Sequence, residues 1–190
     1  MSRYSVLLRQ ADVADAAKLR DLWSEVLRRA DNEEQIADLV AIIERARASE
    51  DERVLVAELD GQLAGAVLLK TATITPLNTE AVVQIVSPFV HPEMRRRGVG
   101  KALLEGAASF AEEQGVHLVG VASLNGAREA NRFLARLGLA PQAVLRMATT
   151  HQLRAKLTRS DVRQPGRQLG QVLAARRSMR RAQTLATTEK

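Results

Sequence analysis

The 190-residue chain contains no cysteine, so it has no disulfide framework, thiol nucleophile or cysteine-ligated metal site. It also lacks any apolar run close to the ~18 residues that a membrane-spanning helix needs. The first ten residues contain only a short apolar stretch, Val6 to Leu8, and no cleavage pattern of a secretory signal. No spacing of His, Asp and Glu is typical of a metal site. We therefore expect a soluble, cytoplasmic protein that binds no metal.

The main part of the chain has no excess of charge of either sign. Residues 1–158 carry 20 Lys or Arg against 20 Asp or Glu, whereas residues 159–190 carry 8 against 2, so the net charge of +6 comes from the tail. The high pI therefore gives no argument for a body that binds nucleic acid. A chain of this length suits one core with an appendage. We expect one domain over 1–158, followed by a basic linker and an amphipathic tail helix over 159–190.

The first 50 residues predict a strand and two helices. Weak alternation of apolar residues predicts a strand over 4–9. Apolar residues at near-helical spacing predict a first helix over 11–30, in which Trp23 belongs to the apolar, core-facing side. A second helix is predicted from the cap-type residues at 31 and 32 to near Ser49.

A β-hairpin is the clearest local pattern in the sequence. The β-rich runs 53–59 and 62–75 flank Asp60-Gly61, a two-residue loop in which glycine tolerates a positive φ. A third β-rich run over 81–90 contains Pro88, which cannot donate a hydrogen bond to a neighbouring strand. We expect a bulge or a splayed strand at that proline.

The remaining elements alternate between helix and strand. Glycines at 115 and 138 are placed to end two of the helices. The order of elements predicts an α/β protein with a mixed, mostly antiparallel sheet and helices on its faces. The predicted elements are a helix over 98–114, a strand over 116–123, a helix over 127–137, an extended segment over 142–148 and a short helix from Thr150.

The stretch from Val90 to Leu104, VHPEMRRRGVGKALL, joins a predicted strand to a predicted helix. Glycines at 98 and 100 let the backbone bend and expose consecutive N–H groups, and the positive end of the helix dipole points to the same place. Such a loop binds phosphate or pyrophosphate. Its spacing matches neither the dinucleotide fingerprint GxGxxG nor the P-loop GxxxxGK[ST], because no Ser or Thr follows Lys101.

This loop resembles the acyl-CoA signature [RQ]xxGx[GA] of the GNAT superfamily of N-acetyltransferases, with Arg95, Gly98 and Gly100 at the signature positions. The Asp60-Gly61 hairpin and the closing segment ANRFLARLGL, residues 130–139, also fall in the order that the family uses. The resemblance covers residues 4–150 and implies the GNAT fold. It also implies an enzyme that transfers an acetyl group from acetyl-CoA, its co-substrate, to a primary amine by direct attack on the thioester.

The resemblance assigns most of the cofactor contacts to the same loop. Backbone amides around it would hold the CoA pyrophosphate, and the three arginines would screen its phosphates. Main-chain groups at the end of the preceding strand would pair with pantetheine, and the Val90 N–H would polarise the thioester carbonyl. The cofactor-binding residues implied are Phe89, Val90, Arg95, Arg96, Arg97, Gly98, Val99, Gly100, Lys101 and Asn131. A solvated Asn131 is an equal alternative.

The usual proton-transfer residues of the family are absent. Many members use a Glu about eleven residues before the first signature residue as base and a Tyr four residues before the final Gly as acid. Here those positions hold Gln84 and Leu134. Glu80 is the candidate catalytic base, acting through a water, because its even offset from Gln84 predicts the same face of the strand. The alternative is a solvated Glu at a strand start.

Three functions are left open by these observations. The first is an active N-acetyltransferase, and the second is a GNAT module that binds acetyl-CoA without catalysis because of Gln84 and Leu134. The third is an interaction protein whose basic tail binds nucleic acid, an anionic membrane surface or an acidic protein partner. A solvated or self-packed tail is the alternative to that role. The acceptor amine and a homo-oligomeric state are not determined. Asp31, Glu33 and Glu34 either attract a cationic amine or serve the helix dipole.

Overall fold

The computed structural model of the chain describes residues 5–122, 128–142 and 146–162. The chain divides into two compact units, Met1–Ala140 and Pro141–Lys190. In the second unit, the described secondary structure is one helix, α5 (Thr150–Val162), on which Leu153 and Leu157 are exposed. Residues 163–190, which hold the predicted tail helix and part of the predicted linker, lie outside the described residues. All other elements below belong to the first unit.

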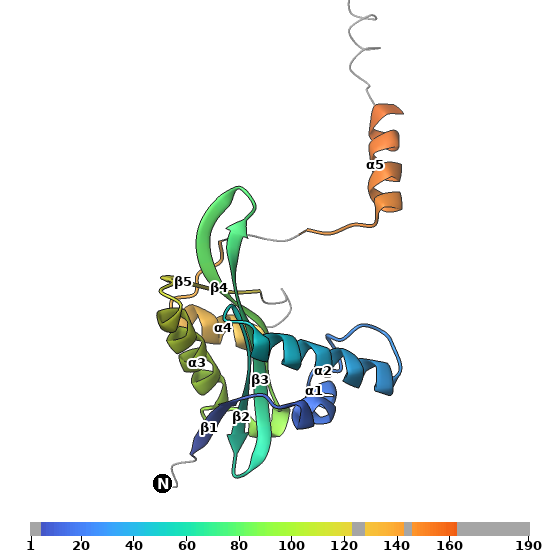
Figure 1. Ribbon diagram of the computed structural model, residues 1–190. Helices are drawn as coiled ribbons and strands as arrows, with labels where there is room; N and C mark the ends of the chain where they lie inside the picture. The colour runs from blue at the N-terminus through green and yellow to red at the C-terminus, as the bar shows by residue number, and fades with distance from the viewer. Residues whose placement is uncertain (1–4, 123–127, 143–145, 163–190) are drawn as a thin grey trace, which may run out of the picture. The chain divides into compact units, whose positions relative to one another are not determined.

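The first unit is built on a mixed sheet, as the sequence predicts. The described strands follow the order β1-β2-β3-β4-β5, with three antiparallel pairs and a parallel pair between β4 and β5 (Figure 1). Hairpins join β2 to β3 and β3 to β4, whereas a helical crossover joins the parallel strands. The strand bounds are β1 Val6–Gln10, β2 Glu52–Leu59, β3 Gln62–Thr75, β4 Asn78–Val90 and β5 Leu118–Val121.

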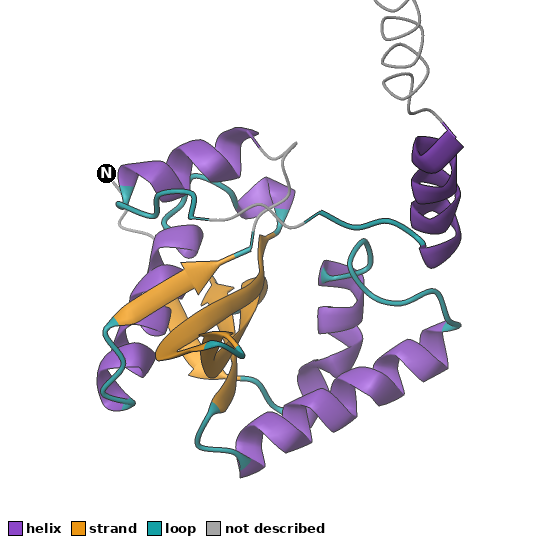
Figure 2. Ribbon diagram, turned by 90° about the horizontal axis from the view of Figure 1, so that it is seen from above, coloured by secondary structure: helices purple, strands orange, loops and turns teal. Residues whose placement is uncertain are grey.

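Helices cover both faces of this sheet (Figures 1 and 2). One face packs on α3 around the fully buried Phe110, and the other packs on α1 and α2 around Leu19, Leu39 and Ile43. Alternate side chains of each strand therefore supply two separate apolar cores. The helix bounds are η1 Val13–Asp15, α1 Ala16–Leu22, α2 Asn32–Ala48, η2 Pro92–Met94, α3 Val99–Glu113 and α4 Arg128–Arg136.

The first predicted helix is wrong in its length. In place of one helix over 11–30, the structure has the short helix η1 followed by α1, which ends at Leu22. Beyond that end, the N–H groups of Val26 and Leu27 both donate to the carbonyl of Trp23. The indole Nε1 of Trp23 donates to the carbonyl of Ser87, 2.9 Å away on β4. This bond to the sheet holds the residue that ends the helix. Leu27 still packs on the same core, which is why the apolar spacing continued past the helix end.

Turn chemistry is where the sequence predictions are confirmed. Asp60 and Gly61 adopt φ values of 54° and 77°, as a two-residue hairpin loop that follows the strand twist requires. Gly115 and Gly138 follow α3 and α4 with φ values of 64° and 86°. Asp31 caps α2 by accepting a hydrogen bond from the Glu34 N–H. The acidic residues at this helix start therefore serve the helix, as one of the two interpretations predicts.

The described residues of the segment 142–148 form neither helix nor strand.

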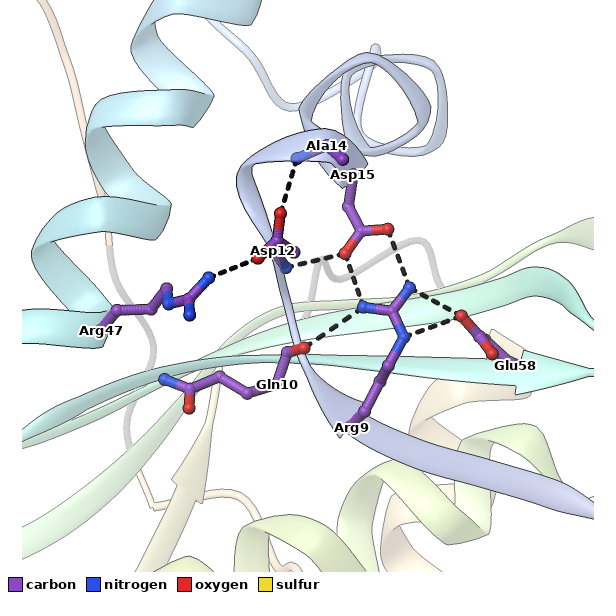
Figure 3. Close-up of polar contacts among 7 residues, drawn as sticks. All are labelled: Arg9, Gln10, Asp12, Ala14, Asp15, Arg47 and Glu58. Carbon is purple, nitrogen blue, oxygen red and sulfur yellow. Dashed lines mark hydrogen bonds and ion pairs between the residues drawn. The ribbon is translucent and has the colours of Figure 1, made fainter.

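An ion-pair cluster centred on Arg9 fixes the approach to α1 (Figure 3). The Arg9 guanidinium donates to both carboxylate oxygens of Asp15, at 2.6 and 2.9 Å, and to Glu58 on β2 at 2.8 Å. Asp15 also accepts the Asp12 N–H, while Asp12 accepts that of Ala14, which completes a capping box at η1. The hydrogen bonds from Arg9 hold the pKa of Asp15 below its usual range, although burial of this carboxylate acts in the opposite direction.

Candidate active site

The parallel strands β4 and β5 separate at the carboxyl end of the sheet. Their pairing begins at Val82 with Leu118 and ends at Ile85 with Val121. Strand β4 continues to Val90, and over this extension the described pairing is with β3 only. Among the described residues, no strand pairs with this edge of β4 along residues 86–90, so the edge is open there, as expected for a splayed strand at Pro88.

A bulge in β4 coincides with this open edge. Val86 pairs with Leu68 and Phe89 pairs with Ala66, so Ser87 and Pro88 together oppose a single residue of β3. Ser87 has a φ of 47°, which non-glycine residues rarely adopt. The bulge predicted from Pro88 is confirmed. Its carbonyl at Ser87 is the acceptor of the Trp23 indole, so an element from the start of the chain holds the strained residue.

The direction of the Val90 backbone follows from the ladder with β3. The His91 N–H donates to the Ala64 carbonyl at 2.8 Å, and Val90 is the partner of Gly65. Neighbouring residues of an antiparallel strand direct their polar groups to opposite sides, so those of Val90 point away from β3, toward the open edge. Those of Phe89 point toward β3. Pro88 has no N–H. Val90 is thus the residue whose N–H is available near the bulge.

Next in the chain comes a loop that exposes the start of α3. Gly98 is the N-cap residue, with a φ of 90°, and it gives the helix no side-chain cap. The first N–H groups of an α-helix have no partner within the helix, and the helix dipole makes this end positive. Arg95, Arg96 and Arg97 are exposed around it, and no acidic residue lies in the first turn. The structure therefore gathers the predicted loop residues into one cationic, amide-rich surface next to Val90.

Gly65 and Gly100 both lie near this loop, but the space around them differs. A Cβ at Gly65 would lie 2.7 Å from the Phe89 carbonyl oxygen and 2.9 Å from Val99 Cγ1, so only glycine fits between β4 and α3. Sequence analysis missed this residue, because nothing local marks a close approach from another element. A Cβ at Gly100 would meet Val90 and the Phe133 ring of α4 at an ordinary 3.7 Å. Packing within the chain does not require glycine at position 100.

Glu80 lies away from the open edge. It is exposed, ten residues before Val90, which is about 33 Å along an extended strand. Thr73 pairs with Ala81 and Thr75 with Asn78, so β4 has one extra residue around Glu80. This irregularity interrupts the alternation on which its common face with Gln84 was predicted. The structure does not bring Glu80 near Val90.

The position expected for a base lies in a cross-strand row of polar residues. Gln84 is paired with Lys70 of β3, which is paired with Glu52 of β2. Glu52 is buried and accepts hydrogen bonds from Lys70 Nζ at 2.9 Å and Arg45 Nε at 2.8 Å. These two cations hold the pKa of Glu52 below its usual range. Such a carboxylate is a weak base, so the row supports the sheet and supplies no proton acceptor at Gln84.

The other proton-transfer position and the remaining predicted contact lie on α4. Leu134 is buried, and its carbonyl accepts hydrogen bonds that close the helix end. Asn131 is half-buried on the same helix, and Phe133 lies next to the start of α3 through Gly100. Ser123 lies outside the described residues. Within the described ranges, no group of three His, Asp or Glu is placed to hold a metal ion.

The family comparison identifies the class of protein to which this fold belongs. Residues 16–139 match the model of the acetyltransferase (GNAT) family. The chain therefore belongs to the GNAT family and is an N-acetyltransferase with acetyl-CoA as its co-substrate. No curated protein sequence is significantly similar to it. None of the described helices is long and apolar enough to cross a membrane.

Solved structures share this fold at low sequence identity. A transcriptional regulator from Bacillus halodurans C-125 is 23% identical, with a TM-score of 0.64 over 76% of this chain and 99% of that chain. The aminoglycoside N-acetyltransferase AAC(6')-Iy in complex with CoA is 17% identical, with a TM-score of 0.64 over 77% and 96%. Glucosamine-6-phosphate N-acetyltransferase from Arabidopsis thaliana is 16% identical, with a TM-score of 0.61 over 77% and 99%. At these identities the likeness concerns the fold.

Proposed function

We propose that acetyl-CoA binds along the open edge of β4, with Val90 at its thioester and the start of α3 at its pyrophosphate. The observation that supports this arrangement is the early end of the β4–β5 pairing at Ile85, which leaves the Val90 N–H facing an unpaired edge. The loop that follows leads directly to the uncapped helix start. One continuous surface thus offers a hydrogen-bond donor for a carbonyl and several amides for phosphates.

The residues of the loop have complementary tasks. Backbone N–H groups from Arg97 to Lys101 would hold the pyrophosphate, and the side chains of Arg95 to Arg97 would lower its charge repulsion. The glycine at position 100 leaves room for phosphate oxygens to approach the backbone, a requirement that packing within the chain does not explain. Asn131 would contact the CoA side from α4.

Catalysis in this arrangement depends on positioning and on one backbone donor. Acetyl-CoA supplies the acetyl group as a thioester. The Val90 N–H would donate to the carbonyl oxygen, where negative charge develops as the amine attacks. Gln84 and Leu134 move no proton, so in this arrangement the acceptor would reach the thioester as a neutral amine. Its nitrogen would form the amide bond as the C–S bond breaks, CoA would leave as the thiolate, and the proton lost by the amine would pass through solvent to that thiolate. Holding a neutral amine in line with the carbonyl can supply much of the rate enhancement.

Thermal unfolding with and without acetyl-CoA tests the cofactor site. Ligand at ~100 times its Kd should stabilise the protein by about 2.7 kcal/mol, a rise in Tm of several degrees for a chain of this size. Gly100→Glu should abolish the rise, because it puts a bulky negative group where phosphate binds. Ala108→Glu adds the same charge at an exposed position farther along α3 and should keep the rise. Unchanged acetyl-CoA affinity of Gly100→Glu in calorimetry would refute the loop assignment.

A further inference from the structure

An apolar pocket of about 120 Å³ lies beside the bulge, on the face of the sheet that α1 and α2 cover. Trp23 and Leu27 after α1, Ile42 of α2, Leu68 of β3 and Ser87 of β4 contribute to its wall. Every residue that the described part of the chain places in this wall is uncharged. The volume is of the order of a cavity of ~150 Å³ that binds benzene, so it suits one small apolar group.

The pocket is close to the point where we place the reacting carbonyl. Ser87 precedes Val90 by three residues, and because the bulge shortens this segment, their Cα atoms lie at most about 10 Å apart. Trp23 uses its indole N–H on the Ser87 carbonyl, so its polar atom is satisfied and the ring serves as an apolar wall. A group held in this pocket can thus carry an amine to the open edge through a few bonds.

The chemistry of the site also selects the kind of amine. Gln84 and Leu134 cannot deprotonate an ammonium group, because neither side chain accepts a proton near neutral pH. A lysine-type amine, with a pKa of about 10.4, is almost fully protonated near neutral pH, whereas an α-amine at about 7.7–8.0 has a substantial neutral fraction. A site in which Gln84 and Leu134 hold the two usual proton-transfer positions therefore favours the less basic amine.

We propose that the acceptor is the α-amine of an apolar amino-acid unit, whose side chain fills the pocket beside Trp23. The proposal rests on the proposed function, because it needs the thioester at Val90. It makes two claims that are separable from cofactor binding: an apolar side chain of about four carbons increases affinity, and an α-amine reacts in preference to a lysine side-chain amine.

An acceptor series tests both claims through release of the CoA thiol near neutral pH. Leucinamide should exceed glycinamide in kcat/KM by at least tenfold, since each buried methylene favours binding. Nα-acetyl-lysinamide, which offers only its side-chain amine, should be at least tenfold poorer than leucinamide. Free leucine and the peptide Leu-Gly-Gly then distinguish an amino-acid acceptor from a polypeptide N-terminus. Equal rates for leucinamide and glycinamide would overturn the proposal.

A variant in the pocket wall tests the role of the pocket, and a variant elsewhere serves as its matched control. Val26 lines the pocket and is 54% exposed, so Val26→Asp introduces a charge there without burying it in the core. It should raise the KM for leucinamide at least tenfold and leave that for glycinamide unchanged. Val13→Asp makes the same change at another exposed valine, on η1, and should behave as the parent protein. A loss of leucinamide preference in both variants would contradict a role of the pocket.

Fluorescence gives a readout that does not need turnover. Trp23 is the single tryptophan of the chain, and it lines the pocket. In the presence of desulfo-CoA, leucinamide should change the Trp23 emission of the parent protein in a saturable way. Glycinamide should give no change in the parent protein, and leucinamide should give none in the Val26→Asp variant. If acetyl-CoA raises the Tm but leucinamide leaves the emission unaltered, the acceptor proposal is wrong and the cofactor assignment stands. If acetyl-CoA gives no rise in Tm, the proposed function fails first.

Discussion

The two faces of the sheet are covered in different ways. On one face α3 lies so close that a Cβ at Gly65 would be 2.9 Å from Val99 and a Cβ at Gly106 would be 2.8 Å from Leu55. On the other face, α1 and α2 leave an apolar pocket between Trp23 and the sheet. Close packing places the start of α3 beside Val90, where we propose that the cofactor binds. The looser face leaves the pocket that we propose for the acceptor, so the two proposed sites differ in how closely the elements around them are packed.

The largest effect should come from disturbing the close face. Gly65→Ala puts a methyl group 2.7 Å from a backbone oxygen and against Val99, which forces β4 and α3 apart. We expect a loss of about 2–3 kcal/mol in the free energy of unfolding, as for other overpacked positions. We also expect weaker acetyl-CoA binding. Urea unfolding and calorimetry measure the two quantities.

Gly120→Ala is the control for that substitution, because its Cβ would meet only Val82, at 3.4 Å. It should cost less than about 1 kcal/mol. Equal destabilisation by the two substitutions would show that the close approach at Gly65 has no special cost.

A somewhat smaller effect is expected where the looser face is anchored. Asp15→Asn removes the charge that Arg9 binds with two hydrogen bonds and should lower the free energy of unfolding by about 2 kcal/mol at pH 7. Asp38→Asn removes an exposed partner of Arg28 and should cost less than about 1 kcal/mol. Denaturant unfolding of both variants compares a buried with an exposed ion pair.

The pH dependence sharpens that test. The folded-state pKa of Asp15 is lowered, so its contribution is complete above the ordinary value near 3.9 and is lost as pH falls through the lowered pKa. The difference between the parent protein and Asp15→Asn should therefore shrink at strongly acidic pH. A difference that is constant from pH 7 downward would mean that the ionised form is not what stabilises α1.

The smallest effect is expected outside both faces, at Glu80. Because this residue is exposed and about 33 Å along the strand from Val90, Glu80→Gln should change kcat/KM less than twofold and leave the pH profile unaltered. Steady-state kinetics across pH 6–10 measures this. A tenfold loss, or a shifted pH profile, would restore Glu80 as the base.

Features that depend on neighbouring residues were predictable from the sequence. Asp60-Gly61 marks the hairpin because a two-residue loop needs positive φ values, and Gly98 and Gly115 mark the ends of α3 for the same steric reason. Pro88 predicted the bulge because it has no N–H for a ladder. The cofactor loop belongs to this group, since its chemistry comes from the consecutive backbone amides of a short segment.

Only the tertiary structure decided the features that join distant segments. The end of α1 depends on a hydrogen bond between Trp23 and Ser87, residues 64 positions apart, which no periodicity records. The need for glycine at position 65 depends on α3, and the exposure of the Val90 N–H depends on where β5 stops. The sequence by itself therefore determined the elements, their turns and the cofactor loop, because short-range sterics and hydrogen bonding act within a few residues. The pocket beside Trp23 and the open edge of β4 arise from packing between elements that are distant in the sequence, so no local pattern of residues reveals them.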